Sequence, residues 1–196
     1  GIIVPDLSQM RAEVEHAFDA VLHPDATSNP LPPQDRIYDI SLGLPLSSYP
    51  LIQAALDILN LSQDPLPLSV LGSVLTSSFV TGADIEMCAR GSLEISLRSK
   101  REAAVSWQHF LRQARPEAGD NAQRACPALA EAMLSFLGRW RELPDAQAPS
   151  EWARDLDLLL RDTGWPGARI LSSPEHQTLQ AWSECLQRLA GFDRII

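Results

Sequence analysis

The spacing of hydrophobic residues changes after Leu61. Before it, two short runs read as strands: residues 2–4, and residues 37–42, where polar residues separate β-branched, aromatic and aliphatic side chains. Each run is followed by apolar residues at helical spacing, over 7–22 and over 50–60. Strand, helix, strand, helix is the order of a βαβα unit, so we expect the two short strands to lie parallel in one sheet.

Capping residues and helix breakers define the ends of these two predicted helices. Asp6, with Gln9 three residues later, forms a capping pattern for the first helix. Gly43 and Pro45 break the second extended run as a turn does. Pro50 fits the first position of the second helix, where its missing N–H costs nothing.

After Leu61 the apolar residues recur at helical spacing, and strand patterns fade. The expected helices each follow a proline or a capping side chain, and they begin near positions 67, 81, 99 or 106, 127, 150 and 172 or 173. We therefore predict a mainly α fold. A small α/β piece, residues 1–61, precedes a helical bundle, residues 62–196.

Charge narrows the possible functions. The chain of 196 residues has a formal net charge of −9, with Lys100 as its single lysine. Proteins that bind nucleic acid on their own gain most of their affinity from basic residues that displace counterions. The sequence therefore predicts a poor independent binder of nucleic acid, with DNA a partner only within a longer protein.

Three further features bear on location and context. Cys88, Cys126 and Cys185 are odd in number and far apart, as is typical of free thiols in a reducing cytoplasm. The sequence has no apolar run long enough to cross a bilayer, so we expect no membrane partner. Because the chain starts without methionine, inside a strand-like run, we expect it to be a segment of a larger polypeptide, whose remainder is its first partner.

Several stretches together carry a family resemblance. They are, in chain order, GIIVPDLSQMRAEVEHAF, YDISLGLPLSSYPLIQAALDILNL, VLTSSFVTGADIEMCAR, SEWARDLDLLLRDTGWPG and SSPEHQTLQAWSECLQRLA. In this order they resemble the second motor lobe and inserted helical domain of inactivated superfamily I helicases, the AddB/RecB-like bacterial DNA repair group. The resemblance implies a role in processing double-strand breaks. In active relatives the turn and helix at 43–61 carry basic residues near the nucleotide, and here that stretch has none.

The chemistry expected of an active motor is missing from the sequence. It contains no GxxxxGK[ST] phosphate loop, no GxGxxG after a strand and no GxSxG elbow. Residues 191–194, GFDR, are similar to a piece of RecB-type nucleases, but we interpret them as a helix end. Asp155 and Asp157 point apart on a helix, and we interpret them as part of a solvated face. We expect no catalytic residue, cofactor or metal in this segment.

Two sets of residues are candidates for contact with a partner. Arg98, Lys100 and Arg101 form a basic cluster that could touch phosphates in the intact protein. A solvated helix, with Arg90 and these residues paired to neighbouring glutamates, accounts for the same pattern. The second set is a narrow apolar stripe suited to packing on a neighbour, formed by Leu179, Trp182, Leu186 and Leu189.

The functional prediction follows from these observations. We expect a non-catalytic scaffold segment of a helicase-like DNA repair protein. The alternative is a stand-alone helical interaction module with no nucleic-acid role, in which the stripe docks a partner helix. The sequence gives no oligomeric state.

Overall fold

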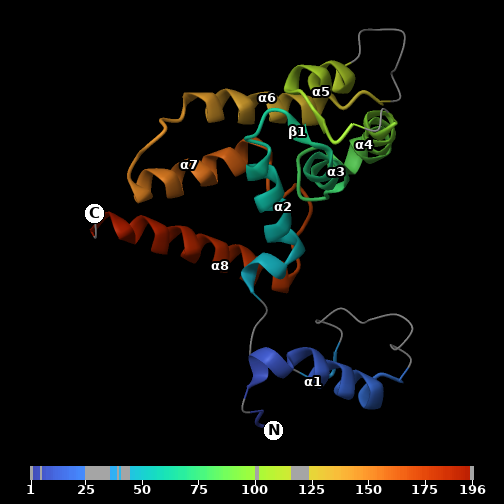
Figure 1. Cartoon of the computed structure of the whole chain (residues 1–196), viewed down its shortest axis with the longest axis vertical. Coiled ribbons are helices and arrows are strands. Elements are labelled where there is room, and N and C mark those ends of the chain that lie inside the picture. Colours follow the sequence, from blue (N-terminus) through green and yellow to red (C-terminus); the bar gives the residue numbers. More distant parts are fainter. Residues whose placement is uncertain are drawn as a thin grey trace. The chain divides into compact units, whose positions relative to one another are not determined.

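The computed structural model describes residues 2–4, 6–24, 36–38, 40, 45–99, 102–115 and 124–194. The chain divides into two compact units, Gly1–Pro45 and Leu46–Ile196, and each is described by itself (Figure 1). The fold is mainly α, as predicted. No helix in the described ranges is long and apolar enough to cross a membrane.

In its described residues the first unit contains one long helix, α1 (Leu7–Leu22). The predicted cap is confirmed, because the Asp6 carboxylate accepts a hydrogen bond from the Gln9 N–H at 3.3 Å. The predicted strand at residues 2–4 is wrong: this segment is irregular, and Ile3 is 95% exposed. Strands form only where a neighbour completes their hydrogen bonds, and the described residues of this unit offer none.

The second predicted strand, residues 37–42, is described only at positions 37, 38 and 40, and none of these is in a strand. Side chains attach this segment to α1 instead. The Tyr38 hydroxyl donates to Asp19 Oδ1 at 2.7 Å, and Arg36 pairs with Glu15 at 3.2 Å and with Asp19 at 3.0 Å. The Tyr38 ring also lies 5.0 Å from that of Phe18. The expected parallel pair of strands is therefore not found in the described part of this unit.

The second unit holds the remaining helices and a small sheet. Its elements are η3 (Leu46–Ser48), α2 (Pro50–Asn60), β1 (Leu66–Pro67), α3 (Leu68–Thr76), α4 (Ala83–Arg98), β2 (Ala104–Val105), α5 (Trp107–Ala114), α6 (Pro127–Glu142), α7 (Pro149–Asp162), α8 (Ser173–Ala190) and η5 (Gly191–Arg194). The two strands pair antiparallel, with Leu66 opposite Val105, so the one sheet of the described residues differs from the predicted parallel sheet in both place and direction.

Helix α2 belongs to the second unit, although the sequence grouped it with the N-terminal piece. Pro50 occupies its first turn as predicted, and its apolar face is buried against α3, α7 and α8. The Trp165 indole N–H donates to the Leu51 carbonyl at 3.0 Å, which closes the chain after α7 onto the start of α2. The division between the compact units therefore falls before α2 rather than after Leu61.

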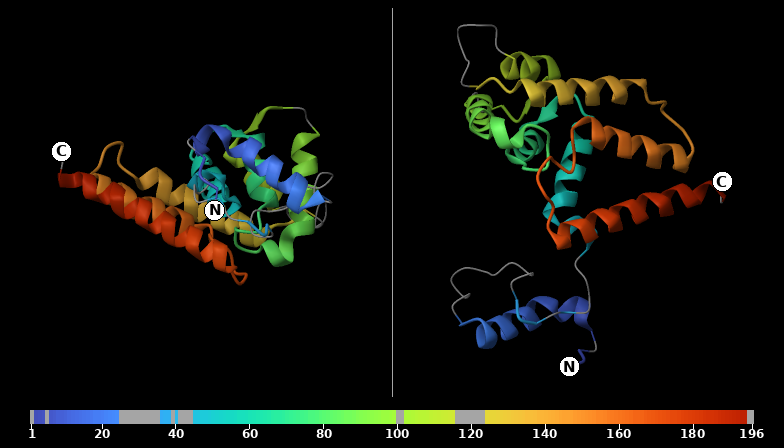
Figure 2. Two further views of the ribbon diagram at one scale, coloured as in Figure 1. Left: turned by 90° about the horizontal axis from the view of Figure 1, so that it is seen from below. Right: turned by 180° about the vertical axis from the view of Figure 1, so that it is seen from behind.

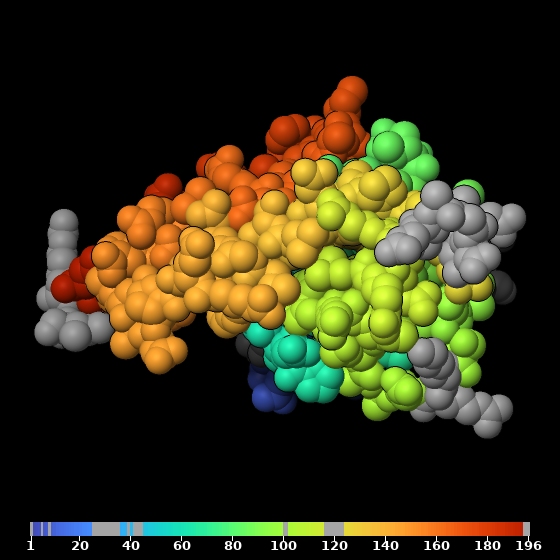
Figure 3. Space-filling model, turned by 90° about the horizontal axis from the view of Figure 1, so that it is seen from above, coloured from blue at the N-terminus to red at the C-terminus, as the bar shows by residue number. Residues whose placement is uncertain are grey.

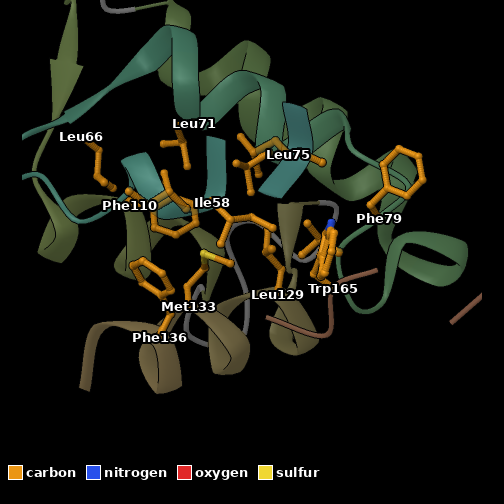
Figure 4. Packing of buried hydrophobic residues seen from close by; sticks show 14 of the residues in the cluster. Ile58, Leu66, Leu71, Leu75, Phe79, Phe110, Leu129, Met133, Phe136 and Trp165 are labelled. Atoms are coloured by element: carbon orange, nitrogen blue, oxygen red, sulfur yellow. The ribbon is translucent and has the colours of Figure 1, made fainter. Parts of the chain in front are cut away.

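The core of the second unit is continuous. Figure 4 shows Ile58 of α2 among side chains that come from α3, α5 and α6, including Leu71, Phe110 and Met133. Helices α6, α7 and α8 pack in succession, with α8 running beside α7 (Figure 2). Figure 3 shows α5 and α6 forming much of one face, with α7 beside α6.

Candidate functional site

Two buried charged residues mark the most unusual site in the second unit. Glu86 and Arg90 lie one turn apart on α4, with 5% and 0% of their surfaces exposed. Arg90 Nη2 lies 3.2 Å from Glu86 Oε2. Charged side chains are almost never this buried unless they are paired, so the surroundings of the pair decide what it does.

The Glu86 carboxylate binds the start of helix α6. Its Oε1 accepts from the Ala128 N–H at 2.7 Å, and its Oε2 accepts from the Leu129 N–H at 3.1 Å. The residue that precedes α6, Cys126, makes no side-chain capping bond. The first amides of a helix lack hydrogen-bond partners within the helix and carry a partial positive charge. The Glu86 carboxylate accepts hydrogen bonds from two of these amides, and its negative charge offsets the positive one.

Arg90 completes this contact between α4 and α6, which we call the Glu86–Arg90 junction. Its Nη2 also donates to the Thr81 carbonyl, so the guanidinium joins α4 to the segment before it. Among the described residues, its Nε and Nη1 have no hydrogen-bond partner. Gly82, with φ +71°, lies against the pair, and a Cβ there would be 3.1 Å from Glu86 Oε2 and 3.0 Å from the Ala128 Cβ. A larger residue would therefore meet both steric crowding and an unfavourable backbone conformation.

The buried thiol beside this pair is not set up for reaction. Desolvation, with a further contribution from the negative charge of Glu86, raises the pKa of Cys126 from 9.0 to about 11. Thiolates, rather than thiols, attack electrophiles and bind metals. In the described residues no group of three or more His, Cys, Asp or Glu side chains is placed to hold a metal ion. The arrangement is suited to holding helices together.

A cavity of about 240 Å³ opens beside the first turn of α4, and Val80, Ala83, Met87 and Arg169 are among the residues that line it. Arg169 is already engaged: its guanidinium lies 4.8 Å from the centre of the Phe79 ring and pairs with Glu175. Hydrogen bonds from Arg169 lower the pKa of Glu175 from 4.5 to about 2.

A second hollow lies between α2 and α3, about 480 Å³ in volume and open to solvent. Hydroxyl and amide side chains line it, together with Asp57, whose pKa is raised by burial. The Gln53 amide in this hollow donates to the Ser47 carbonyl. Neither hollow brings together a nucleophile and a base.

Of the predicted basic cluster, only Arg98 lies in the part of the chain that the structure describes. Arg98 is exposed and pairs with Glu94 at 2.8 Å, while Lys100 and Arg101 lie outside the described residues. Arg90, which the sequence interpretation placed on a solvated face, is fully buried. That part of the prediction is wrong, because Arg90 shares its face of α4 with Leu93 and Leu97, both of which are in the core.

The predicted partner stripe on α8 is largely covered within the chain. Trp182 is 8% exposed and its ring lies 6.1 Å from that of Trp165, and Leu179 and Leu186 pack against the core. Leu189 is half-buried. The stripe packs on a neighbour, as its spacing indicates, but this neighbour lies in the same chain.

Two aspartates interpreted from sequence also act as links. Asp155 is buried, not solvated as expected, and accepts hydrogen bonds from Gln147 at 3.0 Å and Arg154 at 3.1 Å. Asp193, in the GFDR segment, accepts a hydrogen bond from the Ser150 N–H at 2.9 Å and so joins η5 to the first turn of α7. The interpretation of GFDR as a helix end agrees with its position directly after α8.

Sequence reasoning missed the Glu86–Arg90 junction, although a signal was present. Glu86, Arg90, Leu93 and Leu97 repeat at spacings of four, three and four, which places two charges on the apolar face of the predicted helix. That pattern indicates a buried ion pair more than a solvated one. Comparisons of the chain with protein-family models, curated proteins and solved structures find no match.

Proposed function

We propose that this chain is a non-catalytic scaffold segment of a helicase-like DNA repair protein of the type that processes double-strand breaks. The observation that carries the scaffold role is the Glu86–Arg90 junction, where the most buried charges of the described chain hold one helix to the start of another. The DNA repair context comes from the resemblance to inactivated superfamily I helicases, and with it a cytoplasmic location.

Other polar side chains are used in the same way. Arg139 of α6 pairs with Asp162 at the end of α7, and Asp193 binds the start of α7. Glu175 accepts from the Ser172 N–H at 2.8 Å at the start of α8 while it pairs with Arg169. Groups that could carry chemistry are thus engaged at helix ends, which supports an architectural role over a catalytic one.

The alternative of a stand-alone module that docks a partner helix on α8 has less support. Its contact residues would be Leu179, Trp182, Leu186 and Leu189, and the chain already covers most of them. For the helicase-like protein, we propose that contact with DNA uses the basic cluster formed by Arg98, Lys100 and Arg101.

DNA binding by the longer protein that contains this chain tests the proposal. Replacing Arg98, Lys100 and Arg101 with Glu should weaken its affinity for duplex DNA and reduce the salt dependence of binding, since each lost phosphate contact lowers the slope by about 1. The matched control replaces three exposed arginines elsewhere, Arg112, Arg141 and Arg188, with Glu, so the net charge changes equally. An equal loss in both variants would contradict a contact at the cluster.

The isolated chain provides the second arm of this experiment. We expect little binding to duplex or single-stranded DNA at physiological salt, because the chain is acidic, and no ATP hydrolysis. Tight, salt-sensitive retention of DNA by this chain alone, or turnover of ATP, would overturn the scaffold proposal. Sensitivity of a gene-deletion strain to agents that break both DNA strands tests the repair context separately.

A further inference from the structure

The outward face of α4 carries residues at the spacing of a helix–helix seam. The opposite face is buried and consists of Glu86, Arg90, Leu93 and Leu97. The outward residues repeat at alternating intervals of four and three, and they are Asp84, Cys88, Gly91, Ile95 and Arg98. We call these five residues the α4 seam. This alternation keeps one line of side chains facing a second helix along several turns.

Apolar side chains are exposed in and beside the seam. Ile95 of the seam is 71% exposed, and Ile85 and Met87, which flank the seam on opposite sides of the helix, are 78% and 37% exposed. Single exposed apolar residues are ordinary on protein surfaces, so Ile95 contributes to a contact only together with the glycine and the charges beside it in the seam.

Gly91 leaves room at the middle of the seam. A glycine inside a helix costs about 1 kcal/mol relative to alanine. The interior of the unit does not require it, because a Cβ at Gly91 would meet no described atom of the chain within 4 Å. Gly72 of α3 is different: a Cβ there would lie 2.7 Å from Arg98 Nη2 and 2.9 Å from Glu94 Oε1. The surface of α4 at Gly91 is therefore open in the described part of the chain, and a second helix could approach its backbone there.

The charges of the seam are self-complementary. Asp84 and Arg98 lie seven residues on either side of Gly91, about two helical turns each way. If two copies of α4 cross antiparallel about a two-fold axis at Gly91, Asp84 of each copy faces Arg98 of the other. Cys88 then faces Ile95, and the antiparallel helix dipoles attract. The α4 seam is electrically neutral in a chain with a net charge of −9, so pairing along it brings no excess of like charge together within the seam.

We propose that two copies of this chain associate through the α4 seam, antiparallel and centred on Gly91. Arg98 keeps its bond to Glu94 and adds Asp84 of the second copy, which gives a three-membered ion cluster at each end. One helix pair buries less area than a standard interface, so we expect a dissociation constant on the order of 10 μM.

Sedimentation of the whole chain over a range of concentrations tests the pairing. The chain should shift from monomer to dimer, and Ile95→Glu should raise the dissociation constant more than about tenfold. Ile170→Glu is the matched control, because Ile170 is 94% exposed and lies outside α4. A monomer mass up to about 1 mM would overturn the proposal, as would a dimer that both variants weaken equally.

Charge reversal and cross-linking test the antiparallel register. Asp84→Arg alone, or Arg98→Asp alone, should weaken the dimer, and the double variant should restore it, because opposite charges face each other again. With Cys88 and Cys185 replaced by serine, Gly91→Cys should form a covalent dimer on oxidation, since Gly91 faces itself across the axis, while Ile170→Cys should not. Failure of the double reversal to restore the dimer, or equal cross-linking of the two cysteine variants, would exclude this register.

Discussion

Different interactions stabilise each of the two units of the chain. In Gly1–Pro45 none of the described residues is buried, and contacts from Tyr38 and Arg36 to α1 give the unit its order. In Leu46–Ile196 a continuous apolar core extends from Leu51 to Trp182. Small domains bury too little surface to be stable without staples or partners. The first unit therefore depends on partly buried polar contacts, whereas the second has a core of its own.

The largest expected effect compares one phenylalanine from each unit. Phe136 of α6 is 0% exposed and stacks with Trp107 at 6.5 Å, so Phe136→Ala should lower the free energy of unfolding by about 3–5 kcal/mol. Phe18 of α1 is only half-buried, so Phe18→Ala should cost less than about 1 kcal/mol. Urea denaturation followed by circular dichroism measures both. A loss of unfolding free energy for Phe18→Ala as large as the about 3–5 kcal/mol expected for Phe136→Ala would mean that the first unit has a buried core.

The second expected effect concerns the buried ion pair. Glu86→Ala removes the acceptor for two α6 amides and leaves the buried Arg90 charge without its partner, so it should destabilise the protein by about 3 kcal/mol. Glu94→Ala is the control, since Glu94 and Arg98 have the same spacing and Arg98 is exposed. It should change stability by no more than about 0.5 kcal/mol. If Glu86→Ala lowers the stability to thermal unfolding by no more than the small effect expected of Glu94→Ala, the junction adds little to stability.

The smallest expected effect lies in the first unit. Desolvation, together with the hydrogen bond to Asp19, raises the pKa of Tyr38 from 10.0 to about 12. A phenol whose pKa is higher in the folded state adds stability that is present below pH 10 and is lost as the pH rises towards 12. Titration of phenolate absorbance in the wild type and in Tyr38→Phe isolates this group. A Tyr38 titration near pH 10 would show that the contact with α1 does not form in solution.

Much of the helical architecture could be predicted from sequence because its signals are local. The cap at Asp6, the first-turn proline of α2 and the apolar spacing of α7 and α8 involve residues within a few positions of one another. The strands were not predictable in this way. Ile2 and Ile3 have strand propensity, but a strand requires a hydrogen-bonding neighbour, which propensity does not supply.

The Glu86–Arg90 junction was predictable from the sequence only in part. Its spacing along α4 was visible in the sequence, and its apolar neighbours Leu93 and Leu97 indicated which face is buried. What the sequence could not indicate is the occupant of that face, since the amides of Ala128 and Leu129 are over forty positions away. Local pattern gives the pair, and tertiary packing gives its role.

The hydrogen bond from Trp165 to the Leu51 carbonyl has a consequence for biosynthesis. The two residues are 114 positions apart, so α2 leaves the ribosome long before the indole that covers its first turn is made. Domains generally mature as units once their distant contacts exist, and surfaces awaiting those contacts attract chaperones. We expect nascent chains that stop before Gly164 to stay bound to such chaperones, and full-length chains to be released.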